Sequence, residues 1–350
     1  MSEVALSLPR GPLIVGIDGL ALNEATRAQL QHPAVGGVIL FTRNYRDPEQ
    51  LSALTGEIKA LRDPALLITV DQEGGRVQRF QGGFTRLPPL AILGRWHARH
   101  PDRACDLAYR HGRVMAAELL AHGVDLSWAP VLDLAGGVSA VIGDRAMAES
   151  AQAVAELGAY YIAGMNDAGM AACGKHYPGH GSVAADTHVE AVVDVREAAA
   201  VQRDEAPFKA LAPRLAAVMM AHVSYKAMDS QPAGFSSYWI DQRLRRQLGF
   251  EGVVVSDDLD MVGAAGVGGL AERLNTAFAA GCDVALVCQP DSVQSVLSLS
   301  INWPLPPAER LERLVGRPMA SLEEQLRVPE FRAWRSSLQQ LAENSPEQNQ

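Results

Sequence analysis

The chain has few cysteines and no long apolar run. Its 350 residues include four cysteines, Cys105, Cys173, Cys282 and Cys288, and none of them stands in a Cys-x-x-Cys spacing. Scattered cysteines in a chain of this length are typical of small buried apolar side chains. No apolar run approaches the roughly 20 residues that a membrane-spanning helix needs, so we expect no association with a membrane.

An excess of basic residues is also missing. The formal net charge is −9, so no basic face is available to a phosphate backbone and we expect no nucleic-acid partner. Residues 1–12 lack a basic stretch followed by an apolar core, which predicts no secretory signal and a cytoplasmic protein. With 48% hydrophobic and 20% charged residues, the composition suits a soluble globular protein with a full core.

One unit recurs eight times: a short apolar run rich in β-branched residues ends in a polar residue and precedes a helical pattern. Continuous rather than alternating apolar runs are typical of parallel strands that are covered on both faces. Eight such units over about 290 residues predict an α/β fold with a single (β/α)8 TIM barrel, whose typical size is about 250 residues. The predicted strands are residues 13–18, 37–41, 66–71, 124–133, 170–176, 217–222, 252–258 and 282–288.

Helical patterns lie between these runs, and Gly123 and Gly281 are placed as C-terminal helix stops. The predicted helices include residues 48–61, 103–121, 151–168, 196–211, 240–248 and 269–280. Extra C-terminal helices are expected from about residue 301. We therefore predict one domain over residues 1–343, followed by a disordered polar tail at 344–350.

Polar residues stand at the C-terminal ends of the predicted strands, which is the face where barrel enzymes assemble their active sites. For a single aspartate such as Asp133 or Asp258, capping of the following helix explains the position as well as a functional role does. For the whole set, a shared active site is the better explanation. The set is Asp18, Asp71, Asp133, Lys175, His176, His222, Asp257 and Asp258.

Residues 175–188 concentrate titratable chemistry around a Pro-Gly turn. Residues 175–181 read Lys-His-Tyr-Pro-Gly-His-Gly, and residues 186–188 read Asp-Thr-His. Proline and glycine exclude a helix here, so His176 and His180 cannot act as paired metal ligands on one helical face. We expect a strand end followed by a long polar loop that carries Asp186 and His188 toward a substrate.

Four motifs in colinear order carry a resemblance to a known family. Residues 70–79 read Val-Asp-Gln-Glu-Gly-Gly-Arg-Val-Gln-Arg, residues 142–145 read Ile-Gly-Asp-Arg, and residues 256–259 read Ser-Asp-Asp-Leu. Together with the segment 175–188, they resemble the single-domain β-N-acetylglucosaminidases of glycoside hydrolase family 3, over about residues 11–288. One departure is present, because Ala-Met-Ala follows Arg145 where the family usually has an aromatic residue and a glycine.

The resemblance implies a catalytic pair. Asp257 would be the nucleophile of a retaining glycosidase, and a carboxylate suits this role because it is ionised at neutral pH. Asp258 is expected to face away from the pocket, since adjacent residues of a strand point to opposite faces. His188 would be the general acid/base and Asp186 its partner, because a nearby carboxylate favours the protonated imidazole.

The resemblance also implies a clamp on the non-reducing sugar. Charged donors and acceptors suit this task because they make shorter, stronger hydrogen bonds to hydroxyls than neutral groups do. The implied sugar-binding residues are Asp71, Arg79, Arg145, Lys175 and His176. His180 and Asp144 are expected to hold the loop, and Glu73 with the two glycines after it resembles a phosphate-binding loop only superficially.

The implied activity is exo-β-N-acetylglucosaminidase, with no cofactor and no metal. The resemblance further implies a cytoplasmic enzyme of bacterial peptidoglycan recycling. Its substrates would be fragments in which N-acetylglucosamine is β-1,4-linked to an anhydro-muramyl sugar, with or without a peptide. We expect the enzyme to act as a monomer.

Three alternatives stay open. Lys175 at a strand end would suit a Schiff-base aldolase or lyase, although that chemistry gives no reason for Asp257 or for the Asp186/His188 pair. A metal-dependent barrel hydrolase would want His-x-His after the first strand, where this chain has Asp18 and Gly19. The third alternative is a sugar-binding barrel that has lost catalysis.

Overall fold

Eight parallel strands form the centre of the molecule. The computed structural model describes residues 6–136, 139–183 and 192–345. Neighbouring strands follow the order β8-β5-β3-β2-β14-β13-β11-β9, and all of these pairs are parallel. The bounds are β2 Leu13–Gly16, β3 Val35–Leu40, β5 Leu67–Val70, β8 Leu126–Ser127, β9 Cys173–Tyr177, β11 Ala217–Met220, β13 Val253–Asp258 and β14 Val284–Val287.

The chain that continues β8 closes the sheet into a barrel. Val131 forms a parallel bridge to Lys175 of β9, and the backbone N–H of Leu132 donates to the carbonyl of Lys175 at 2.7 Å. A second bond joins the same two segments: the backbone N–H of Cys173 donates to the carbonyl of Ala129 at 2.8 Å. The predicted strand 124–133 is therefore present as two short pieces, each of which pairs with a different neighbour.

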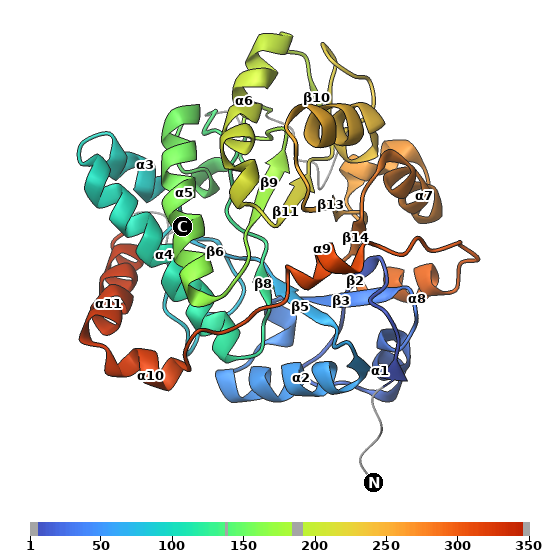
Figure 1. Cartoon of the computed structure of the whole chain (residues 1–350), viewed down its shortest axis with the longest axis horizontal. Helices are drawn as coiled ribbons and strands as arrows, with labels where there is room; N and C mark the ends of the chain where they lie inside the picture. The colour runs from blue at the N-terminus through green and yellow to red at the C-terminus, as the bar shows by residue number, and fades with distance from the viewer. Residues whose placement is uncertain (1–5, 137–138, 184–191, 346–350) are drawn as a thin grey trace.

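Helices surround the barrel (Figure 1). Residues that are typical of helix caps stand at their ends in the sequence. At α2, the Asp47 side chain accepts from the N–H of Gln50 and Pro48 occupies the first turn, where a missing N–H is harmless. At α7, Gly281 ends the helix with a φ of 114°, a left-handed conformation that favours glycine. The helices are α1 Glu24–Leu30, α2 Pro48–Ala60, α3 Ala91–His97, α4 Pro101–Ala121, α5 Ala151–Ala168, α6 Ala198–Leu211, the π-helix η5 Tyr238–Gln247, α7 Leu270–Ala280 and α8 Pro290–Leu297.

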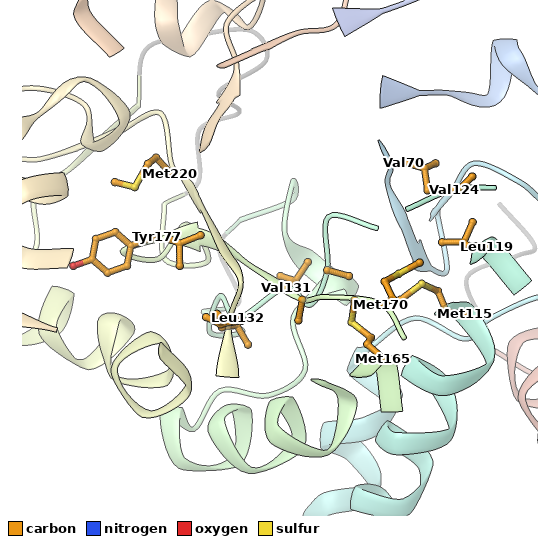
Figure 2. Packing of buried hydrophobic residues seen from close by; sticks show 14 of the residues in the cluster. Val70, Met115, Leu119, Val124, Val131, Leu132, Met165, Met170, Tyr177 and Met220 are labelled. Carbon is orange, nitrogen blue, oxygen red and sulfur yellow. The ribbon is translucent and has the colours of Figure 1, made fainter. Parts of the chain in front are cut away.

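Successive strand residues point alternately into the barrel and out toward the helices. On β2, Ile14 belongs to the buried cluster inside the barrel, whereas Leu13 and Val15 belong to the cluster beneath the helices. Figure 2 shows part of the second cluster, where α4 and α5 place Met115, Leu119 and Met165 against Val70, Val131 and Met170. The four cysteines are buried and free, as predicted.

The C-terminal helices are present and cover two parts of the barrel. Leu311 of α9 (Ala308–Glu312) and nearby Leu314 join the cluster inside the barrel. Helices α10 (Leu322–Arg327) and α11 (Pro329–Glu343) pack on α4, where Arg335 Nε lies 2.7 Å from the buried Glu118 carboxylate. Within the described ranges, no helix has the length and apolar character needed to cross a bilayer.

Candidate active site

A cavity of about 430 Å³ lies at the carboxyl ends of the barrel strands, within the size range of small-molecule sites. Six of the eight predicted site residues line it: Asp71, Arg79, Arg145, Lys175, His176 and Asp257. The other two, Asp186 and His188, lie outside the described residues, so their roles stay predictions. Asp18, another strand-end residue, is exposed and is not among the lining residues.

A buried ionic network forms one wall of the cavity. Lys175 Nζ lies 2.7 Å from Asp71 Oδ1 and 2.6 Å from Glu73 Oε1. The Arg145 guanidinium donates twice to the Glu73 carboxylate, from Nε and Nη2, both at 2.8 Å. Arg79 extends the network, with Nη2 3.8 Å from Asp71 Oδ2. Because Asp71, Glu73 and Lys175 each contact two opposite charges, they present a rigid polar surface to a ligand.

Protonation in this network is set by competition between burial and the opposite charges. Burial alone would raise the pKa of Glu73, but Arg145 and Lys175 outweigh it and hold that pKa well below its ordinary value. Burial would lower the pKa of Lys175, but Asp71 and Glu73 raise it above the ordinary value. Lys175 is thus an ammonium at neutral pH, which argues against the Schiff-base alternative because that chemistry starts from a neutral amine.

His176 is oriented by a buried carboxylate. Its Nδ1 lies 2.7 Å from Asp133 Oδ2, and Asp133 Oδ1 accepts from the backbone N–H groups of His176 and His180 at 3.2 and 2.7 Å. Burial would raise the pKa of Asp133, but the interaction with His176 lowers it below the ordinary value. With Nδ1 turned toward Asp133, Nε2 is the ring nitrogen that His176 can offer to a ligand in the cavity.

Asp257 is the penultimate residue of β13 and is half-buried at the cavity. Its Oδ1 accepts from the backbone N–H of Asp258 at 2.8 Å. Burial would raise the pKa of Asp257, but His176, His222, the Asp258 N–H and Lys175 together lower it. The ring of His222 stacks on Phe235, with centroids 5.1 Å apart, and its Nε2 lies 3.2 Å from the carbonyl of Asp258. Asp257 is therefore an ionised carboxylate next to the space for a ligand.

The expected orientation of Asp258 is only partly correct. Asp258 Oδ1 accepts from the N–H groups of Asp260 and Cys288, at 3.0 and 3.2 Å, as expected for a residue that holds its neighbours. The residue nevertheless lines the cavity as well. Strict alternation fails here because the pairing of β13 with β14 shifts register between Val255 and Asp258. Burial and the carboxylates of Asp260 and Asp257 raise the pKa of Asp258 to about 7.

One residue of the site, Glu73, was missed at the sequence level, and the role of a second, Asp133, was left open. Glu73 joins Lys175 to Arg145, and its spacing of two from Asp71 on an extended segment was the available signal. Asp133 was left open between a helix cap and a functional role, and it proves to orient His176. Asp144 pairs with Arg76 at 3.1 Å, in line with its expected role in the loop.

The Ala-Met-Ala departure after Arg145 packs into the protein interior. Ala146 and Met147 are buried, and the carbonyl of Ala148 accepts from the N–H of Ala135 at 2.9 Å. Arg145 keeps its double hydrogen bond to Glu73 in this setting. As for the metal alternative, the ranges that the structure describes contain no group of three His, Cys, Asp or Glu side chains placed to hold an ion.

Comparison with known proteins places this barrel in a family. The profile of the "Glycosyl hydrolase family 3 N terminal domain" matches residues 5–315, so the chain belongs to glycoside hydrolase family 3 and is a glycoside hydrolase. A beta-hexosaminidase of Thiobacillus denitrificans is 54% identical over 91% of this chain and 92% of its own length. A beta-hexosaminidase of Chromobacterium violaceum is 51% identical over 96% of both chains.

A solved structure agrees over nearly the whole molecule. The crystal structure of NagZ from Neisseria gonorrhoeae in complex with N-trifluoroacetyl-D-glucosamine superposes with a TM-score of 0.91. It is 42% identical to this chain, and the match covers 97% of this chain and 100% of the other. The barrel predicted from the sequence is thus confirmed by the structure and by its similarity to this neighbour.

Proposed function

We propose that the chain is an exo-acting β-N-acetylglucosaminidase that retains the anomeric configuration through a covalent glycosyl-enzyme. The observation that carries this proposal is the position of Asp257, an ionised carboxylate at a cavity whose wall is the Asp71–Glu73–Arg145–Lys175 network. The names of the relatives support an N-acetylhexosamine substrate, as does the N-trifluoroacetyl-glucosamine bound to the neighbouring structure.

In the first step, Asp257 attacks the anomeric carbon and the bond to the leaving group breaks. The pKa of Asp257 is lowered, so the carboxylate is available as a nucleophile near neutral pH. The charged network holds the hydroxyls of the non-reducing sugar, with Asp71 as acceptor and Lys175, Arg79 and Arg145 as donors. Because the Glu73 carboxylate already engages Lys175 and Arg145, it orients these donors and has little freedom to react.

The leaving oxygen needs a proton, and we propose that His188 supplies it with Asp186 as its partner. Both residues lie outside the described ranges. A competing carboxylic acid in the described part of the cavity is Asp258, whose pKa is raised to about 7, so that it is partly protonated near neutral pH. Asp258 adjoins the nucleophile in the chain, whereas a retaining enzyme places its proton donor across the scissile bond, and this favours His188.

The natural substrates that we propose are cytoplasmic peptidoglycan fragments, in which N-acetylglucosamine is β-1,4-linked to an anhydro-muramyl sugar with or without a peptide. The resemblance to the family's cell-wall-recycling members supports this choice. An assay with aryl β-N-acetylglucosaminide beside aryl β-glucoside tests the activity, with the anomer of the first product followed by NMR. Fast cleavage of the acetamido sugar with β-product first supports the proposal, and an α-anomer as first product contradicts it.

A further inference from the structure

A second cavity, of about 360 Å³, adjoins the candidate active site at the same end of the barrel. Arg76 and the loop that carries Asp144 form the boundary between the two cavities, because Arg76 lines both of them. Arg86 and Gln81, from the loop after β7 (Val77–Gln78), line the second cavity on its other side. The two cavities therefore share Arg76 as a lining residue, and Asp144, the partner of Arg76, also lines the second one.

Arg76 is held firmly in the boundary. Its Nε lies 3.1 Å from Asp144 Oδ1, and its Nη2 donates to the carbonyl of Ala140 at 3.0 Å and to that of Val141. About half of its side chain, 49%, is still exposed. These contacts use Nε and Nη2, so Nη1 is the donor group that Arg76 can offer to a ligand.

Arg86 carries a positive charge that the described residues do not balance. Its Nη1 donates to the Gln81 side-chain oxygen at 2.9 Å, which is a neutral partner. Its Nε is shielded from solvent and has no hydrogen-bond partner among the residues that the structure describes. Because Nε is shielded, a ligand in the cavity can reach Arg86 only through its terminal nitrogens, and an anion suits them best because their described partner, Gln81, is neutral. This charge is present in a chain whose net charge is −9.

We infer that the second cavity binds the carboxylate of an anionic aglycone, with Arg86 as the principal contact and Arg76 as the second. The inference rests on the proposed exo-glycosidase activity, in which the first cavity holds the non-reducing sugar and the leaving group extends outward. In a muramyl aglycone the carboxylate has two possible sources. It is either the free lactyl group or, when a peptide is attached through that group, a carboxylate of the peptide.

The test compares kcat/KM for four substrates that share the same terminal N-acetylglucosamine. The aglycones are N-acetylglucosamine itself, an anhydro-muramyl sugar with a free lactyl carboxylate, the same sugar with that carboxyl capped as a neutral amide, and the same sugar carrying a peptide with free carboxylates. Each is measured with wild type, with Arg86→Gln and with Arg214→Gln. Arg214 is an exposed arginine just before β11, at the opposite end of the barrel, so its removal changes the net charge equally.

The wild type should prefer one of the anionic aglycones over the neutral ones by about fivefold, as expected for a half-exposed charged contact. The preference should shrink as salt is added. Arg86→Gln should abolish it and leave cleavage of the two neutral substrates unchanged, whereas Arg214→Gln should keep it. If Arg86→Gln lowers kcat/KM for the free lactyl substrate alone, the lactyl carboxylate is the ligand. If it lowers kcat/KM for the peptide substrate alone, the ligand is a carboxylate of the peptide.

The inference is overturned if wild type shows no preference for any anionic aglycone, or if Arg86→Gln slows neutral and anionic substrates equally. It is also overturned if Arg214→Gln has the same effect as Arg86→Gln, because the effect would then come from net charge. Failure of the proposed function is a separate result: wild type would not cleave the neutral N-acetylglucosamine disaccharide at all.

Discussion

Replacement of Glu73 by glutamine tests the buried network by removing one charge at nearly constant volume. The side chains of Glu73 and Lys175 are each 1% exposed, and that of Arg145 is 11% exposed, so the change leaves two buried cations without their shared carboxylate. Removal of one partner from a buried pair costs about 3–5 kcal/mol. Set against a typical unfolding free energy of 5–15 kcal/mol, this is a large share of the stability of the whole domain.

Urea unfolding followed by tryptophan fluorescence measures the loss of unfolding free energy. Trp128 and Trp239 are fully buried, so they become exposed when the protein unfolds. The matched control is Glu57→Gln, whose carboxylate pairs with Arg27 at 3.0 Å at the surface. Exposed pairs of this kind contribute about 0–1 kcal/mol, so the control should unfold nearly as wild type does. Equal unfolding midpoints for the two variants would refute the view that the network is a desolvated, energetically coupled unit.

Acid dependence provides a second check on the same variant. Folding depresses the pKa of Glu73. Its contribution to the free energy of unfolding is therefore fully present above the unfolded-state pKa of about 4.3, and it is lost as the pH falls through the folded-state pKa. Glutamine does not titrate, so the difference in unfolding free energy between wild type and Glu73→Gln should become smaller below about pH 4. A gap that stays constant from pH 7 into the acid range would mean that the Glu73 charge is not what stabilises the fold.

Three further predictions concern catalysis. Asp257→Ala should abolish turnover in a steady-state assay and leave the circular dichroism spectrum unchanged, whereas Asp258→Ala should keep part of the activity. Full activity of Asp257→Ala would show that Asp257 is not the nucleophile. His188→Ala should cut cleavage of sugar–sugar bonds by roughly 10²–10⁴-fold but nearly spare the first step on an aryl substrate with an acidic phenol, so rapid mixing should show a phenol burst. Equal losses on both substrates with no burst would mean that His188 only holds the loop and that another group donates the proton. Chitin oligomers should shorten by one residue at a time in chromatograms, and early internal dimers or trimers would contradict exo action.

The barrel could be predicted because its determinants are local. Each strand is a short apolar run, and helix ends carry their own signals, such as Asp47 and Pro48 at the start of α2 and Gly281 at the end of α7. The predicted helix 151–168 has the same bounds in the structure. The prediction was poorest around β8, because Pro130 lacks an N–H and the predicted strand divides into two pieces that pair with different neighbours.

The candidate site was predictable only in part, because much of it depends on contacts between distant segments. Asp257 and Lys175 stand at strand ends, and that position alone marked them. The roles of Glu73 and Asp133 depend on which side chains they contact from another segment, 72 residues away in the chain for the Glu73–Arg145 pair and 43 for Asp133–His176. No local pattern encodes such pairings. The orientation of Asp258 depends on a register shift between two strands, which a single sequence does not show.

The most direct test of the proposed mechanism is to identify the residue that carries the sugar. The enzyme is incubated with a slow, fluorinated N-acetylglucosaminide that has a good leaving group, then digested and mapped by tandem mass spectrometry. A retaining mechanism through Asp257 predicts a stable adduct of one sugar per chain, attached to the peptide at Asp257 and lost in Asp257→Ala. An adduct on a peptide that lacks Asp257 would contradict the assignment of the nucleophile.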